Sequence, residues 1–259
     1  MPPTLRRLRG FSLVELAVVL IIVSLLTGGL LLGISAQQNS VKTSDAARQM
    51  ENITEALVGF AVINGRLPCP ASAASRGQES YSGTLGKSPC STYHGGFLPA
   101  ATLGVAPTDS DGFALDPWGT RVRYAVSSDP DSDAMDSNAN GAQRHTFTTT
   151  DGIRSLGLAA AHPDIHVCSG GAAQVSTASA RCASPELTHV AVAVIVSGGP
   201  NGRQGALGSD EQGNGDGDRV FVSRTVSDRG TAGGEFDDIV AWISPNVIYS
   251  RLIAAGRLP

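Results

Sequence analysis

Hydrophobic and polar residues follow different patterns in successive parts of the chain, and the first part is apolar almost without interruption. Between Phe11 and Ile34, Glu15 is the only ionisable residue. At 1.5 Å per residue, about 24 residues form a helix of roughly 36 Å, longer than the hydrocarbon thickness of a bilayer, about 30 Å. The pattern therefore predicts a membrane-spanning helix over residues 11–34.

The next part of the chain is polar, with apolar residues that recur every three or four positions. Met50, Ile53, Leu57 and Phe60 have this spacing, with Ala46, Ala47 and Ala61 beside them. Such spacing places one apolar stripe on a helix. Gly65 and Pro68 are typical signals for the end of a helix. We therefore expect one helix of about 50 residues, with residues 35–65 as its amphipathic half.

Beyond residue 65, short apolar runs alternate with clusters of Gly, Pro, Asp and Ser, which favours strands and loops. The runs predict strands at 121–126, 190–197, 219–224 and 239–243, and a short closing helix at 246–258. The run HVAVAVIVSG is apolar on both alternating faces and predicts a central, buried strand. The expected fold is α+β: a long N-terminal α-helix packed on a C-terminal antiparallel β-sheet globular domain with long loops.

Charge is distributed unevenly along the chain. The net charge of −4 includes Arg6, Arg7 and Arg9, and without the first ten residues 16 basic residues face 23 acidic ones, a net of −7. By the positive-inside rule, the arginines keep the N-terminus cytoplasmic and place the remainder across the membrane. An acidic domain lacks the clustered Lys and Arg side chains that bind the phosphate backbone of nucleic acids, so no nucleic-acid partner is expected.

The four cysteines form two local pairs, Cys69 with Cys90 and Cys168 with Cys182. Neither pair has the close C-x-x-C spacing of a zinc ribbon or a thioredoxin-like site. In an oxidising compartment this arrangement favours two disulfides, whereas a cytosolic chain would carry four unpaired thiols.

The run RGFSLVELAVVLIIVSLL resembles the N-terminal signature of type IV pilins and type II secretion pseudopilins. That signature has a basic leader ending in Gly, then an aromatic residue, and a Glu at the fifth mature position. Gly10, Phe11 and Glu15 match these three features. Many of these proteins also have a Pro near the twenty-second mature position, where this chain has Leu31 and Leu32.

The resemblance implies the domain organisation and the cellular location. Residues 1–10 would be a prepilin leader, 11–34 the transmembrane and polymerisation half of the helix, 35–65 its amphipathic half, and 66–259 a periplasmic or extracellular domain. A prepilin peptidase would cut between Gly10 and Phe11, and the new Phe11 amine would be methylated. The chain would enter the bacterial inner membrane as a single-pass protein, contact lipid, and then join a periplasmic or extracellular filament.

The resemblance also implies a role for Glu15. A carboxylate inside a membrane persists where it has a partner, and the family pairs it with the N-terminal amine of a neighbouring subunit. The amine of the same chain, one helical turn away, is a second candidate partner, and a simple location at the headgroup level is a third interpretation. Other pilin or pseudopilin subunits and an inner-membrane assembly platform are the remaining expected partners.

Acidic residues gather at three places that merit comparison with calcium sites: 129–136, 210–218 and the pair Asp237 and Asp238. None has the ligand spacing of an EF-hand. We expect solvated turns at the first two. The stretch from SGGPNG to EFDDIVAW resembles a calcium-wrapping loop of pseudopilins, which makes Asp237 and Asp238 the candidate ligands of a structural calcium ion.

No catalytic motif is present. The sequence has no H-E-x-x-H, no G-x-S-x-G, no phosphate loop and no dinucleotide fingerprint, so we expect a protein that is not an enzyme. The leading hypothesis is a structural subunit, a minor pilin or pseudopilin. The alternatives are a minor pilin at the filament tip that recognises a surface or substrate, and a monomeric membrane-anchored binding protein.

Overall fold

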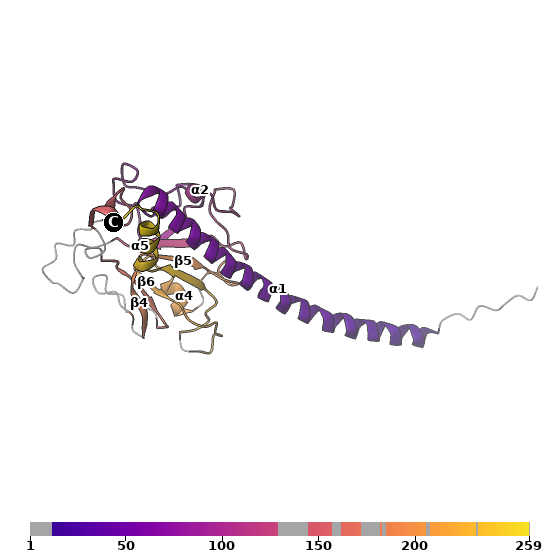
Figure 1. Ribbon diagram of the computed structural model, residues 1–259. Coiled ribbons are helices and arrows are strands. Elements are labelled where there is room, and N and C mark those ends of the chain that lie inside the picture. The colour runs from indigo at the N-terminus through magenta and orange to yellow at the C-terminus, as the bar shows by residue number, and fades with distance from the viewer. Residues whose placement is uncertain are drawn as a thin grey trace, which may run out of the picture. The chain divides into compact units, whose positions relative to one another are not determined.

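The structure is a computed structural model, and it describes residues 12–128, 145–156, 162–171, 182, 185–205, 208–231 and 233–258. The side chains of 27–37 and 155–156 are outside this description. The chain divides into two compact units, Met1–Lys42 and Thr43–Pro259. The second half of the N-terminal helix therefore belongs to the unit that also contains the sheets (Figure 1).

Helix α1 is the longest element and spans Leu13–Asn64, which is 52 residues. It ends at Gly65, whose φ of 68° lies in the left-handed region that glycine adopts without strain. The predicted length and end of the helix are therefore confirmed. Among the residues that the structure describes, no helix is both long enough and apolar enough to cross a membrane.

The proposed membrane half of α1 stays a prediction. Phe11 and the side chains of residues 27–34 lie outside the described residues. The side chains from Leu13 to Leu26 are described. Several large apolar side chains among them are exposed, such as Leu13 at 87% and Leu25 at 72%, so no other described residue packs over them.

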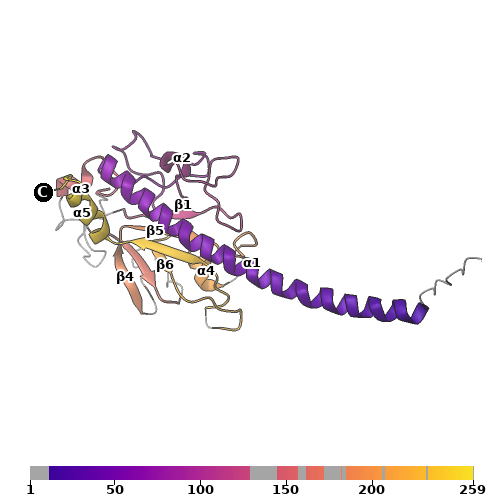
Figure 2. The same ribbon diagram turned by 45° about the vertical axis from the view of Figure 1, so that its right-hand side comes forward.

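In the second unit, α1 buries one face against the sheet. Ala46, Met50, Ile53, Leu57 and Ala61 are almost fully buried, and all but Ala46 belong to the main hydrophobic core. The predicted stripe differs at two positions, since Ala47 is exposed and Phe60 is half-buried. Figure 2 shows this part of α1 passing across β5, with the closing helix α5 near its C-terminal end.

Among the described residues, the main sheet has four strands in the order β1-β2-β5-β7, and all neighbours are antiparallel. The strands are Gly96–Phe97 (β1), Arg123–Val126 (β2), Ala193–Ser197 (β5) and Ile239–Ile243 (β7). Every residue of β5 is buried, and β5 lies between two other strands, as the run of β-branched residues predicts.

A second sheet has the order β4-β3-β6, with Glu186–Ala191 (β4), Ile165–Cys168 (β3) and Val220–Val222 (β6). Strands β3 and β6 pair in parallel, so the domain is antiparallel-rich, and the expectation of an antiparallel sheet holds only in part. The predicted strand 190–197 was wrong as one element. The regular pairing breaks at Val192, where the chain passes from the edge of the second sheet to the centre of the first.

In the part of the second unit that the structure describes, the helices after α1 are short. They are Ala100–Leu103 (α2), Gly152–Leu156 (α3), Ser209–Gly213 (α4) and Pro245–Ala254 (α5). Helix α5 corresponds to the predicted closing helix and contributes Ile248, Tyr249 and Leu252 to the main core.

Both disulfides that the local cysteine pairs predict are present, Cys69–Cys90 and Cys168–Cys182. The cysteines of the first belong to the main hydrophobic core, and the second joins the end of β3 to Cys182. The disulfides therefore hold together residues that are 21 and 14 positions apart in the sequence.

Candidate functional site: the N-terminal helix and a carboxylate cluster

Glu15 lies in the first turn of α1. Ser12 precedes the helix, and its Oγ accepts a hydrogen bond from the Glu15 backbone N–H at 3.3 Å. Ser12 and Glu15 thus have the S-x-x-E spacing of a helix N-terminus, a signal that the sequence interpretation did not use. An acidic side chain in the first turn also interacts favourably with the helix dipole.

The Glu15 carboxylate has no hydrogen bond or ion pair with any residue that the structure describes. Gly10 and Phe11, the expected processing residues, lie outside the described residues. The position in the first turn of a helix is therefore a local reason for a carboxylate here, and the carboxylate remains available to a partner from another chain.

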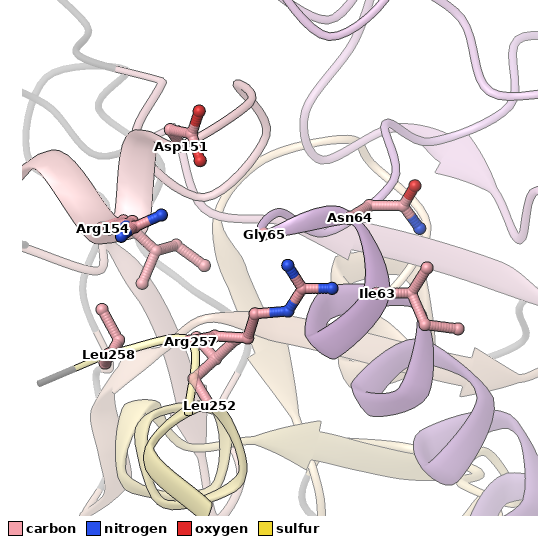
Figure 3. A pocket seen from close by; sticks show the side chains of 9 residues that line it. Ile63, Asn64, Gly65, Asp151, Arg154, Leu252, Arg257 and Leu258 are labelled. Atoms are coloured by element: carbon pink, nitrogen blue, oxygen red, sulfur yellow. The ribbon is translucent and has the colours of Figure 1, made fainter. Parts of the chain in front are cut away.

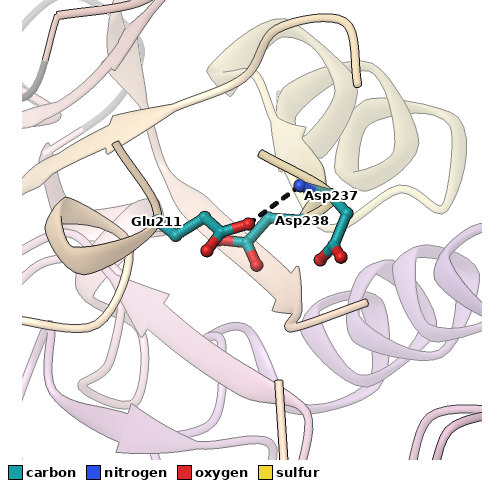
Figure 4. Close-up of side chains that lie close together, drawn as sticks. All are labelled: Glu211, Asp237 and Asp238. Atoms are coloured by element: carbon teal, nitrogen blue, oxygen red, sulfur yellow. Dashed lines mark hydrogen bonds between the residues drawn. The ribbon is translucent and has the colours of Figure 1, made fainter. Parts of the chain in front are cut away.

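The second candidate site is a group of three carboxylates, shown in Figure 4. Asp237 and Asp238 come directly before β7, and Glu211 comes from α4. One carboxylate oxygen of each lies within 4.8 Å of the others. The sequence identified Asp237 and Asp238, but it missed Glu211, because nothing local indicates that α4 folds against the start of β7.

Glu211 is 3% exposed and is held by neutral donors. Asn201 Nδ2 donates to both of its oxygens, at 3.0 and 3.2 Å, and the Asp237 backbone N–H donates to Oε1 at 2.9 Å. These hydrogen bonds fix the orientation of the carboxylate. The Glu211 side chain therefore has a defined position beside the two aspartates.

The two aspartates respond to this buried charge. Burial, with repulsion from Glu211, raises the pKa of Asp237 to about 6. Burial also raises the pKa of Asp238 to about 7, with further increases from Glu211 and Asp237, although a hydrogen bond from Asn214 acts in the opposite direction. Ionisation of both aspartates is therefore unfavourable in this environment, and a bound cation would offset the repulsion between the close carboxylates.

The donor set fits a hard cation. Calcium takes six to eight oxygen ligands and prefers carboxylates. Asp237 Oδ1 is buried and has no hydrogen-bond partner among the described residues. Gly199 allows the close approach of the two loops, since a Cβ there would lie 2.3 Å from the Asp237 carbonyl oxygen.

Access to the cluster comes through a cavity of about 310 Å³ that Glu211 and Asp238 help to line. Arg123 lines the same cavity, and its Nη1 donates to the Gly215 carbonyl at 3.2 Å. The cavity is therefore large enough for water molecules to complete the coordination of a bound ion.

The other acidic stretches behave differently from the cluster. Residues 129–136 lie outside the described residues. The expectation of a solvated turn at 210–218 was wrong for its first part: Asp210 is 1% exposed and lies 2.7 Å from Arg224 Nε. The reason is tertiary, since α4 packs against β6 and carries Asp210 and Glu211 to the interior.

Comparison with known proteins identifies the N-terminal part of the chain. Residues 5–31 match the family model of the prokaryotic N-terminal methylation motif, which is the signature of type IV pilins and pseudopilins. The matched range contains Gly10, Phe11 and Glu15. No curated protein and no solved structure matches the chain significantly.

Proposed function

We propose that this chain is a structural subunit, a minor pilin or pseudopilin, of a type IV pilus or type II secretion filament. Its leader is cut between Gly10 and Phe11, the Phe11 amine is methylated, and the mature chain polymerises through α1. Its role is architectural and not enzymatic. Before assembly the subunit resides in the bacterial inner membrane, where the prepilin peptidase and the assembly platform act on it.

The observation that carries this proposal is the N-terminal methylation motif with Glu15 inside it. After cleavage, a positively charged amine at Phe11 needs a counter-charge in a low-dielectric environment. Glu15 supplies a carboxylate without a partner in the described structure. The pair forms between the amine of a docking subunit and Glu15 of the subunit ahead of it.

The surface of α1 supports assembly as well. Exposed large apolar side chains occur repeatedly from Leu13 to Leu26, among them Leu16 at 55% and Ile21 at 60%. Contiguous apolar surface of this kind marks contact with lipid or with other proteins. In the proposed cycle, lipid covers this surface first, and the helices of neighbouring subunits cover it in the filament.

Processing is tested by co-expression with a prepilin peptidase and mass spectrometry of the purified chain. The expected product lacks residues 1–10 and carries one methyl group on Phe11. A product that keeps the leader in the presence of an active peptidase contradicts the proposal.

The position in the filament is tested by immunogold labelling of sheared filaments. Labels along the shaft or at intervals support a structural subunit, and a label only at the end supports the tip-located alternative. Labels that remain in the membrane fraction, with none on filaments, support the monomeric receptor.

We also propose that calcium binds at Glu211, Asp237 and Asp238 and holds α4 and the loop after β5 against the start of β7. The support is the close group of three carboxylates, of which Glu211 is buried and the two aspartates are half-buried, with an oxygen of Asp237 that has no hydrogen-bond partner among the described residues. Metal analysis of protein dialysed against calcium and then against calcium-free buffer tests the binding. Retention of less than about one tenth of an equivalent, with no calcium-dependent change in stability, contradicts it.

A further inference from the structure

A second cavity, of about 220 Å³, lies where the C-terminal end of α1 meets α3 and the end of the chain after α5 (Figure 3). Its lining combines an apolar part with charged side chains. The apolar part is formed by Ile63, which is exposed, and by three buried side chains, Ile153, Leu252 and Leu258. Arg154, Arg257 and Asp151 supply the charges.

The two arginines come from distant parts of the sequence and face the same space. In Figure 3, Arg257 extends toward the last turn of α1, and Arg154 lies across the cavity on α3. Both side chains are exposed, and neither guanidinium has a hydrogen bond or ion pair with a residue that the structure describes. With the single carboxylate of Asp151, the lining carries a net charge of +1, within a chain whose net charge is −4.

This combination has a specific chemical preference. Guanidinium groups bind carboxylates with paired, directional hydrogen bonds. The buried leucine and isoleucine side chains favour an apolar group next to the carboxylate. We propose that this cavity binds a carboxylate carried beside an apolar side chain, as at the C-terminus of a peptide.

The size of the cavity agrees with a small group. At about 30 Å³ per water, its volume corresponds to roughly seven water molecules. That is room for one amino-acid residue and not for an extended ligand, since typical small-molecule sites exceed about 300 Å³. For a ligand of this size we expect a dissociation constant on the order of 1 mM.

A purely structural role is the competing explanation. Arg257 lies near the end of α1, and a cation there interacts favourably with the helix dipole. In that case replacement of the arginine lowers stability but does not change the binding of any carboxylate. The test therefore has to separate ligand binding from folding.

The probe is N-acetyl-leucine, and its matched control is N-acetyl-leucinamide, which has the same shape without the negative charge. Ligand-observed NMR with the full-length protein measures both. We expect the acid to bind and the amide to bind at least tenfold more weakly. N-acetylglycine, which keeps the carboxylate but lacks the apolar side chain, should also bind several-fold more weakly.

The protein variants are Arg154→Gln and Arg257→Gln, with Arg48→Gln as the control, since Arg48 is also exposed but lies outside the cavity. Each cavity variant should weaken N-acetyl-leucine binding about tenfold, and the control should not change it. Equal binding of acid and amide by the wild-type protein overturns the proposal, as does no binding of the acid at about 20 mM, roughly 20-fold the expected constant. The comparison of ligands remains decisive even if a variant fails to fold. It is also independent of filament assembly, because a chain that never polymerises retains this cavity.

Discussion

Replacement of Asp238 by Asn tests the carboxylate cluster, because it should raise the stability of the calcium-free protein and abolish the stabilisation by calcium. The substitution removes one negative charge and leaves an amide that is similar in shape. Asn214 Nδ2 donates to Asp238 Oδ2 at 2.8 Å, and the amide oxygen of the substituted side chain can accept the same bond. In calcium-free protein at neutral pH we expect the variant to be more stable than the wild type, whereas calcium should no longer stabilise it.

The expected magnitude follows from the pKa of Asp238, which burial raises from 3.8 to about 7. A tenfold change in proton affinity is worth about 1.4 kcal/mol, so the ionised carboxylate destabilises the metal-free fold by roughly 4 kcal/mol. Because Asp238 is coupled to Glu211 and Asp237, this figure is an upper bound for one substitution. It corresponds to an increase of roughly 10 °C in the melting temperature of a domain of this size.

The sign of the pH dependence follows from linkage. The folded state holds protons on Asp237 and Asp238 at pH values where the unfolded chain has already lost them. Stability from this cluster is therefore fully present below about pH 4 and is lost as the pH rises through about 7. Calcium acts in the opposite direction, since it needs ionised ligands, and its stabilising effect should be large at about pH 8 and small at about pH 5.

The assay is thermal unfolding followed by circular dichroism at about pH 5 and pH 8, each with a chelator and with excess calcium. Glu51→Gln is the matched control, because it removes a negative charge from an exposed position of α1. An Asp238→Asn protein that is no more stable than the wild type at the higher pH with the chelator contradicts the destabilising role of the Asp238 charge. Equal stabilisation of variant and wild type by calcium contradicts the role of Asp238 as a ligand.

Three further predictions concern assembly and stability. Glu15→Val should leave processing intact but reduce filaments by at least tenfold in sheared fractions, because an unpaired amine in low dielectric costs about 3–5 kcal/mol; normal filament yield would refute the pairing. Ile53→Ala should lower the free energy of unfolding by about 2–5 kcal/mol, because Ile53 is fully buried. Ile63 is 71% exposed, so Ile63→Ala should change the free energy of unfolding by less than about 0.5 kcal/mol. Denaturant titration measures both. Cys168→Ser combined with Cys182→Ser should cost about 3 kcal/mol, because the disulfide closes a loop with a sequence separation of 14, and an unchanged denaturation midpoint would contradict this.

Local sequence signals predicted the elements whose causes are local. The spacing of Met50, Ile53 and Leu57 indicated the buried face of α1, and Gly65 indicated its end. The apolar run that contains β5 correctly predicted a buried central strand. The predicted strand began at residue 190, however, whereas β5 begins at Ala193, after the break at Val192. Periodicity reports which side chains are apolar, and it does not report that the chain changes sheets within an apolar run.

The candidate sites divide in the same way. Gly10, Phe11 and Glu15 are recognisable from sequence because the motif is contiguous. Asp237 and Asp238 were identified from sequence, but their neighbour Glu211 is 26 residues from Asp237 and was not. The composition of 210–218 indicated a solvated turn, and only packing shows that Asp210 and Glu211 are buried.

The sequence by itself determined the N-terminal motif, the long helix with its end at Gly65, and the two local cysteine pairs. Each of these depends on residues close together in the chain or on a regular period along it. The tertiary structure alone decided that Glu211 joins the aspartates and that Arg154 and Arg257 share one cavity. The physical reason is that these groups meet through the packing of separate elements, and the charge, burial and pKa of each group depend on what that packing places beside it.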